Sequence, residues 1–404
     1  MTKSDRGVDG VRQSRAPGLS GRSFRLMLLT SLAGFGGYAL LLPVVPLWAS
    51  TGGAGEFGAG ATTGALMLST VGTQFAVPWA LRRWGHRVVL GGGMIVLGAP
   101  TPLYAVSADL PLLLAVSLVR GVGFGLVTVA GSALVAELVP TAELGRASAR
   151  YGIAVGLPQL ALLPAGVAVA EVVGFAPLFV LAGALPVVSV LAVPWIRVPE
   201  RSTARLDSIG DAPEQPARWQ AVRAAAGPWL AMLGCSTAQG GLITFLPLAV
   251  TGSRLLVPLA LLATTAGALV GRLVAGELTD RYGRAGWLLP FGVGAAALGM
   301  AAEAAAGGSP AVVLAGAALV GIGFGVVQNS SIVVLFAAAG AAGYGGASAA
   351  WNIAYDAGTG LGATGLGALA QPLGFEAAFG ASAVLLAATL PVVLSRRPRA
   401  EGAR

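Results

Sequence analysis

Long, continuously apolar segments separated by short polar ones organise this chain. A segment that crosses a bilayer as a helix needs about 20 residues, and we count twelve apolar runs of that size. The first six runs start near Leu26, Gly60, Val88, Pro111, Ala147 and Ala176, and the other six near Ala224, Leu255, Gly286, Ala311, Gly346 and Ala377. The pattern predicts an all-α membrane protein with twelve transmembrane helices.

A membrane β-barrel is the alternative architecture. Its strands are about ten residues long and alternate apolar with polar positions. The runs here are about twice that length and continuously apolar, so helices are favoured. A polar stretch divides the runs into two sets. We predict cytoplasmic tails at 1–24 and 396–404, six-helix bundles at 25–196 and 223–395, and a cytoplasmic linker at 197–222.

The distribution of charge predicts how the chain is oriented. Apolar residues make up 55% of the sequence and charged residues only 10%, against about a quarter in soluble proteins. The formal charge of +8 is compatible with nucleic-acid or anionic-lipid partners, but its placement decides between them. Arginines gather in the tails, the linker and the segments on the same side, whereas acids occupy the other side: Glu56, Asp109, Glu171, Glu303 and Glu376. By the positive-inside rule, both termini are cytoplasmic in a multi-pass inner (plasma) membrane protein, and no nucleic-acid partner is needed.

The reactive side chains needed by most enzymes and metal sites are scarce. Cys235 is the only cysteine and His86 the only histidine, so we expect no disulfide, no metal site and no cofactor. A membrane enzyme would need clustered histidine, aspartate or cysteine, and no such cluster is evident. The only lysine is Lys3 and the phosphate-binding loop G-x-x-x-x-G-K is absent, so this chain is not expected to use ATP directly.

The two halves of the chain repeat each other at a spacing near 200 residues. The run Gly121-Val122-Gly123-Phe124-Gly125 recurs as Gly321-Ile322-Gly323-Phe324-Gly325, Ala147-Ser148-Ala149 recurs as Ala347-Ser348-Ala349, and Gly174-Phe175 recurs as Gly374-Phe375. Six helices, a linker and six related helices predict two bundles arranged in parallel, with a binding site between them.

The segment after the eighth run resembles the loop signature G-x-x-x-D-R-x-G-R of the major facilitator superfamily. Gly276, Asp280, Arg281, Gly283 and Arg284 occupy its defined positions. The copy expected after the second run is degraded, because Arg82 replaces the aspartate, Pro78 the first glycine and His86 a basic residue. The resemblance implies two six-helix bundles related by a pseudo-two-fold axis, a small-molecule substrate, transport by alternating access, and a monomer.

Two further segments resemble patterns of this family in part, and the second is reminiscent of its bacterial drug/metabolite proton antiporters. The fourth run matches R-x-x-x-G-x-G only in part, since Ser117 stands at the arginine position and Arg120 lies one turn along. The fifth run is rich in glycine and proline but lacks the Gly-Pro pair, since Leu163 precedes Pro164. Protons are therefore the expected coupling ion.

In this family the first, fourth, seventh and tenth helices line the central cavity. The resemblance therefore implies a modestly polar substrate cavity, and its candidates are Tyr38, Arg120, Thr128, Ser132, Gln239, Thr244, Gln328 and Asn329. Asp356 is the deepest acid, about ten residues into its run. It is expected either to carry the coupling proton or, with Asn352, to make a polar contact between the bundles.

The leading hypothesis is proton-coupled efflux of a small hydrophobic or amphipathic organic compound, as in multidrug resistance. Uptake by symport or facilitated diffusion is the first alternative, and more polar or charged residues in the cavity would favour it. A non-transporting membrane receptor is less well supported, because the longest polar segments are only about 22 residues.

Overall fold

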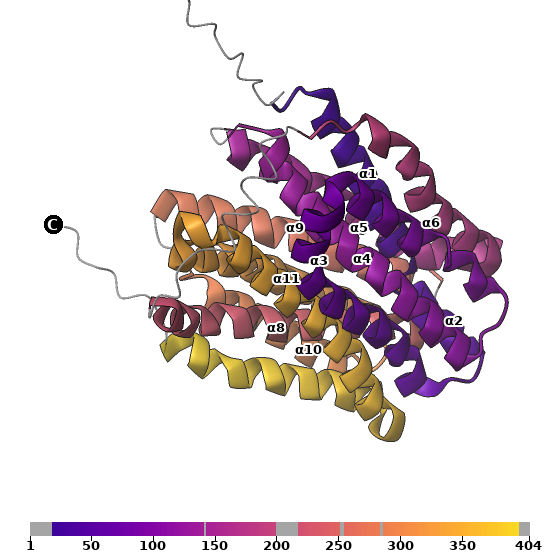
Figure 1. Cartoon of the computed structure of the whole chain (residues 1–404). Helices are drawn as coiled ribbons and strands as arrows, with labels where there is room; N and C mark the ends of the chain where they lie inside the picture. The colour runs from indigo at the N-terminus through magenta and orange to yellow at the C-terminus, as the bar shows by residue number, and fades with distance from the viewer. Residues whose placement is uncertain (1–17, 141–142, 199–216, 251–253, 283–285, 396–404) are drawn as a thin grey trace, which may run out of the picture.

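The computed structural model describes residues 18–140, 143–198, 217–250, 254–282 and 286–395, and within these residues it is built of helices without strands. Figure 1 shows the first half, indigo to magenta, beside the second half, salmon to yellow. The helices of the first half are α1 (Arg22–Leu41), α2 (Val44–Thr51), α3 (Gly55–Gly98), η1 (Thr101–Ala105), α4 (Leu110–Leu138), α5 (Leu144–Val173), α6 (Phe175–Ser189) and η3 (Val190–Trp195). Those of the second half are α8 (Ala217–Ala249), α9 (Leu256–Tyr282), α10 (Leu289–Ala304) and α11 (Pro310–Ser395).

The helices agree with twelve membrane crossings. Nine described stretches are long and apolar enough to span a bilayer, and α10 is a shorter apolar helix. Two of the nine, Gly55–Ala105 and Gly346–Leu394, are about twice the necessary length. Each contains a glycine with positive φ, Gly85 in α3 and Gly374 in α11, where a residue with a Cβ would be strained. Each therefore folds back as two crossings, and the total is consistent with the twelve helices predicted from the sequence.

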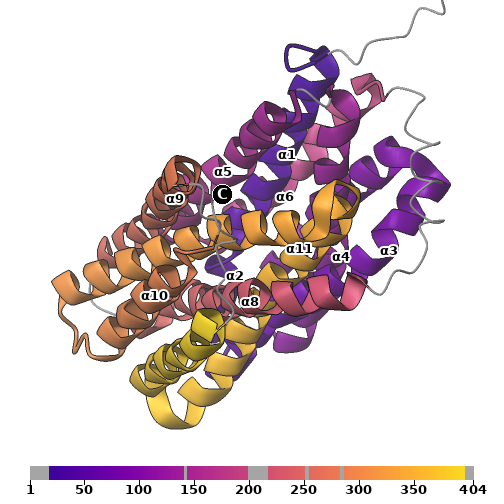
Figure 2. The same ribbon diagram turned by 90° about the vertical axis from the view of Figure 1, so that its left-hand side faces the viewer.

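An even number of crossings brings both ends of the chain to one side of the bundle. We call the side that carries the start of α1 and the end of α11 the terminal face. The opposite side, which carries the turn between α2 and α3 and the turn at Gly374, is the distal face. Figures 1 and 2 show the start of α1 and the end of α11 on the terminal face.

The glycine motif shared by the halves has the same packing role in each. A Cβ on Gly121 would overlap the carbonyl oxygen of Leu66, and a Cβ on Gly321 would overlap that of Thr264. Gly123 and Gly323 likewise lie against the backbones of α3 and α10. Small residues let membrane helices approach to backbone contact, so the motif holds the fourth and tenth crossings against their neighbours.

The turn between the last two crossings of each half is also repeated. Gly174 separates α5 from α6 with φ of 85°, and Gly374 bends α11 with φ of 84°. Both are followed by phenylalanine. The internal repeat in the sequence is thus a repeat of backbone conformation and helix packing.

The helices differ in how much of their surface is covered by protein. In α8, 83% of the most apolar stretch is buried, whereas in α6 with η3 the value is 33%. α8 packs extensively against α11, and Gly240 and Gly362 bring their backbones into contact. α8 is therefore central, and α6 presents most of its surface to lipid.

Candidate functional site

Arg120 is a fully buried charge in the middle of the first half. It lies in α4 with 2% of its surface exposed. Its Nε donates a hydrogen bond to the Leu97 carbonyl oxygen at 3.2 Å, and its Nη1 lies 3.5 Å from the Tyr104 hydroxyl oxygen. The guanidinium carbon is 5.4 Å from the Tyr104 ring centroid, a distance at which a cation is attracted to an aromatic ring. No ion pair to Arg120 is found among the described residues.

A small cavity opens beside Arg120. Its volume is about 10 Å³, enough for about one water molecule. It is lined from the first half by Tyr38, Leu41, Leu42, Val45, Thr62, Thr63, Leu66, Tyr104, Ser117 and Arg120. The Tyr104 and Ser117 hydroxyl oxygens are 2.8 Å apart. Of the eight substrate-cavity residues predicted from the sequence, Tyr38 and Arg120 line this cavity. They offer an aromatic face and a positive charge to the same space.

Tyr38 connects this cavity to the second half. Its ring stacks on Phe124, with centroids 4.1 Å apart. Its buried hydroxyl has no hydrogen-bond partner among the described residues, and the side chain interacts electrostatically with both Arg120 and Asp356. Tyr38 therefore lies between the buried cation of one half and the buried acid of the other.

Asp356 makes a polar contact across the two halves. The Gln74 amide Nε2 in α3 donates a hydrogen bond to the Asp356 carboxylate Oδ2 in α11 at 2.6 Å. Asp356 is 2% exposed and Gln74 is 6% exposed. The second amide atom, Gln74 Oε1, is buried without a partner among the described residues. The bond joins a helix of the first half to a helix of the second half.

The Gln74–Asp356 bond lies at one end of a seam between α3 and α11. Toward the distal face the two helices touch through small residues, because a Cβ on Gly60 would overlap the Ala363 carbonyl and one on Gly64 would overlap Thr364. At the distal end the Phe57 amide nitrogen donates to the Gln371 Oε1 at 3.2 Å. The distal half of the interface is thus closed by direct helix contact.

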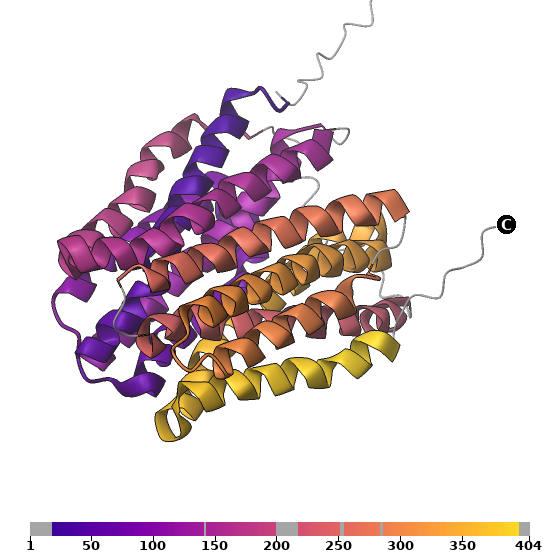
Figure 3. The same ribbon diagram turned by 180° about the vertical axis from the view of Figure 1, so that it is seen from behind.

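A second contact between the halves lies on the other side of the molecule. Figure 3 shows α9 running beside α5, and the two helices are in contact. The Arg272 guanidinium lies close to Gly152 in this contact. The two halves therefore meet along α3 with α11 and along α5 with α9.

The remaining cavity candidates lie in several environments. The hydroxyls of Thr128 and Ser132 bond the Gly125 and Val129 carbonyls of their own helix, and Asn352 Nδ2 bonds the Ser348 carbonyl. Gln239 and Thr244 are buried in α8, and the Thr244 hydroxyl has no partner among the described residues. Gln328 and Asn329 are half-buried in α11, and Asn329 lies close to Gly276.

The loop signature is only partly visible. Gly276, Asp280 and Arg281 belong to the last turns of α9, where the Arg281 guanidinium carbon is 5.9 Å from the Tyr282 ring centroid. The side chain of Asp280 is exposed. Gly283 and Arg284 lie outside the described residues.

Two residues of this region, Gln74 and Tyr104, were not predicted from the sequence. Gln74 is a single amide in a strongly apolar run. A polar residue in such a run could have been predicted to have a buried partner, because a buried amide in a membrane needs one. Tyr104 was missed because it lies in the short helix η1 beyond the third run. It reaches Arg120 only through the packing of η1 on α4.

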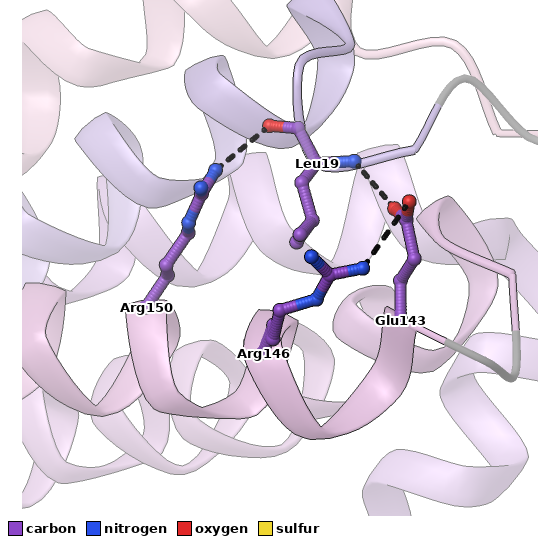
Figure 4. A network of polar contacts seen from close by, with 4 residues as sticks. All are labelled: Leu19, Glu143, Arg146 and Arg150. Atoms are coloured by element: carbon purple, nitrogen blue, oxygen red, sulfur yellow. Dashed lines mark hydrogen bonds and ion pairs between the residues drawn. The ribbon is translucent and has the colours of Figure 1, made fainter.

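A polar network ties the start of α1 to α5 on the terminal face (Figure 4). The Leu19 amide nitrogen donates to Glu143 Oε2 at 3.0 Å, and Arg150 Nη1 donates to the Leu19 carbonyl at 3.3 Å. Arg146 Nη2 is 3.9 Å from Glu143 Oε1, but the Arg146 side chain is 72% exposed. The network anchors the chain where it enters the first crossing.

Comparison with known proteins identifies the fold and family. The family model described as Major Facilitator Superfamily matches residues 26–363 and 229–404. No curated protein sequence matches this chain.

Three solved transporters share the fold at low sequence identity. A bacterial homolog of the human lysosomal transporter Spinster, inward-facing and unoccupied, has a TM-score of 0.75 at 15% identity over 94% of this chain and 98% of its own. A POT family transporter in complex with 5-aminolevulinic acid gives 0.76 at 14% identity over 96% and 99%. A mutant of the nucleoside transporter NupG gives 0.73 at 11% identity over 93% and 100%.

Proposed function

The chain belongs to the Major Facilitator Superfamily of membrane transporters, and we propose that it exports a small hydrophobic or amphipathic organic compound by proton-coupled alternating access. We propose that it works as a monomer in the inner (plasma) membrane. The arginines Arg82, Arg83, Arg146 and Arg281 gather toward the terminal face, and the positive-inside rule makes that face cytoplasmic.

The observation that carries the coupling proposal is the hydrogen bond from Gln74 to Asp356 between the two halves. An ionised Asp356 accepts from the Gln74 amide NH₂. A protonated Asp356 carries an O–H, and the unpartnered Gln74 Oε1 is an acceptor for it within the same pair. Proton binding thus replaces a hydrogen bond to a charged Asp356 carboxylate with hydrogen bonding to a neutral carboxyl. The strength of the contact between the bundles changes, because hydrogen bonds to charged groups are stronger than neutral ones.

A change in the strength of this bond biases two conformations. The seam from Phe57 to Gln74 closes the distal face, so in the proposed cycle this structure is a state that is closed on that face. A ligand or proton shifts such an equilibrium only by as much as it favours one state over the other. In the other conformation, which is open on the distal face, this seam must separate. Asp356 lies at one end of the seam, so its protonation can shift the equilibrium between the two conformations.

The proposed substrate class follows from the groups around Tyr38. Aromatic and aliphatic side chains dominate the cavity lining, and Arg120 supplies one charge. We propose that an amphipathic molecule binds these groups when the two bundles part, with its apolar part against Tyr38 and the leucines and a polar acceptor near Arg120. We propose that Gln239 and Thr244, buried in α8, and Gln328 and Asn329 in α11 complete the site from the second half.

The test is transport in sealed proteoliposomes with an imposed pH gradient. A fluorescent lipophilic cation and a neutral fluorescent amphiphile are the probes, and Asp356→Asn is compared with Glu171→Gln, a matched exposed acid on α5. We expect the wild type and Glu171→Gln to move a probe against its gradient as protons move the other way. We expect Asp356→Asn to lose this drive but to retain equilibrative exchange.

Two results would change the proposal. Normal coupled transport by Asp356→Asn would make Asp356 structural and assign the proton to another group. Probe movement that no gradient influences in the wild type would support facilitated diffusion, and movement in the direction of the proton gradient would support symport.

A further inference from the structure

A hollow lies in the second half at the distal face, away from Arg120. Its volume is about 400 Å³, which lies within the size range of small-molecule sites. The ends of α8, α9 and α10 and the turn at Gly374 surround it. Its lining comprises Leu246, Ala249, Val250, Leu256, Glu303, Ala306, Gly307, Gly308, Val313, Leu373, Gly374, Phe375, Glu376 and Phe379.

Glu303 contributes a buried carboxyl to this hollow. Only 5% of the residue is exposed, and its Oε1 accepts no hydrogen bond from the described residues. The carboxyl lies against Gly316 and the backbone of Ala317 in α11. A buried carboxyl oxygen without a donor is costly, and no lysine or arginine is among the lining residues. The hollow is therefore lined by a buried carboxyl residue with no basic residue beside it, and the unpartnered Oε1 itself lies against Gly316 in α11.

The first half has a space equivalent to this hollow, and there it is filled by side chains. Gly123 packs against Gly93 and Leu97, and its repeat Gly323 packs against Gly292 and Ala296. Gly93 and Leu97 of the third crossing therefore correspond to Gly292 and Ala296 of α10, an offset of 199 residues. By the same offset, Tyr104 in the first half corresponds to Glu303 in the second. The neighbours agree, because the Tyr104 hydroxyl bonds Ser117 and Glu303 contacts Ala317.

The aromatic residues around these two positions differ in their packing. In the first half, Phe179 meets the Tyr104 ring at 5.4 Å between centroids, and Phe175 meets Trp48 at 4.8 Å. The Trp48 indole N–H also donates to the Tyr104 carbonyl at 2.9 Å. In the second half, Phe375 and Phe379 line the hollow together with Glu303. A filled aromatic cluster in one half thus corresponds to an open space with a carboxyl in the other.

We propose that this hollow is a second ligand site, which binds a compact organic cation: a protonated amine attached to an apolar or aromatic group. The ammonium would donate a charge-assisted hydrogen bond to the Glu303 carboxylate and neutralise its charge. The apolar part would pack on Phe375 and Phe379, whose ring faces also attract cations. Glu376 is exposed at the rim, where a negative charge raises the local concentration of cations.

The site is separate from the transport pathway proposed above. None of its lining residues lines the cavity at Tyr38 and Arg120, and Asp356 is absent from both linings. Binding at the distal hollow therefore goes beyond the proposed transport function and is measured without transport.

The experiment is isothermal titration calorimetry on the full-length protein in lipid nanodiscs at neutral pH. Benzylammonium chloride is the probe, and benzyl alcohol is its neutral counterpart of similar shape. We expect saturable binding of benzylammonium and much weaker binding of the alcohol. Glu303→Gln, which keeps the side-chain shape, is expected to weaken benzylammonium binding roughly tenfold or more, because it removes a charge-assisted hydrogen bond.

Matched variants separate this site from others. Glu171→Gln removes an exposed acid of the first half, and Asp356→Asn removes the buried acid of the seam. Both are expected to leave benzylammonium affinity unchanged. Phe375→Leu is expected to weaken binding, whereas Phe175→Leu, its counterpart in the first half, is not. If size-exclusion chromatography shows that Glu303→Gln does not fold, the comparison of Phe375→Leu with Phe175→Leu tests the proposal instead.

Three outcomes overturn the proposal. They are the absence of saturable benzylammonium binding to the wild type, equal affinity for benzyl alcohol, and loss of binding in Asp356→Asn while Glu303→Gln or Phe375→Leu binds normally.

Discussion

Gln74 of the first half and Asp356 of the second half form a buried hydrogen bond of 2.6 Å, 282 residues apart in the chain. Each residue belongs to a helix that packs on the other half, and the bond lies at the end of the glycine-lined seam between α3 and α11. In the proposed alternating-access cycle the two halves separate along this seam, so the strength of this bond would affect transport as well as the stability of the fold.

Gln74→Leu should destabilise the protein by about 1–3 kcal/mol, because it leaves a buried carboxyl without its donor. Gln159→Leu is the control, since the Gln159 amide bonds only the Val155 carbonyl of its own helix. The double variant Gln74→Leu/Asp356→Leu should lose less than the sum of the two single variants, because it removes both partners. Thermal or denaturant unfolding in detergent gives these values, and strict additivity would mean that the two side chains do not interact.

Gly60→Ala should impair closure of the distal face. The new methyl group would overlap the backbone carbonyl of Ala363, and backbone cannot move aside as a flexible side chain can. Gly72→Ala is the matched control, because a Cβ there meets no atom within 4 Å.

Cross-linking between Phe57→Cys and Gln371→Cys, in a background lacking the buried Cys235, measures this closure. We expect a reduced cross-link yield with Gly60→Ala and an unchanged yield with Gly72→Ala. Equal yields in the two backgrounds would show that the contact at Gly60 does not hold the face closed.

Arg120→Lys should abolish most transport although it retains the charge. The guanidinium uses a planar set of donors to reach the Leu97 carbonyl and the Tyr104 hydroxyl, and a lysine ammonium cannot reproduce that geometry. Ser117→Ala removes one of the two partners of the Tyr104 hydroxyl and should reduce transport by a smaller factor. Initial rates in proteoliposomes, normalised to folded protein, rank the two variants. Wild-type rates with Arg120→Lys would mean that charge alone suffices at this position.

Glu143→Ala should loosen the entry of the chain into α1 by about 1 kcal/mol, because the Leu19 amide loses its acceptor. Arg146→Ala should change stability by less than about 0.5 kcal/mol, since its ion pair with Glu143 is exposed. Limited trypsin digestion at Arg22 and Arg25 reports on this region. We expect faster cleavage in Glu143→Ala alone, and similar cleavage in both variants would assign the anchoring to the ion pair instead.

Much of the architecture was predictable from one sequence because a bilayer constrains a chain so strongly. Every backbone polar group in the membrane must bond within its own helix, so run length alone indicates helices, and their starts near Pro111 and Ala311 fall within one residue of α4 and α11. The repeat was visible because the same backbone packing needs glycine at Gly121 and Gly321 in both halves. The family followed from the loop around Asp280.

The sites depended on tertiary structure because their partners lie far apart in the chain. No local pattern pairs Gln74 with Asp356, or places Tyr104 on Arg120, since those contacts arise when separate helices pack. Glu303 looked in the sequence like one more acid of the distal side. Only the packing of α10 on α11 shows that it is buried, that it occupies the place of Tyr104, and that the space beside it is open.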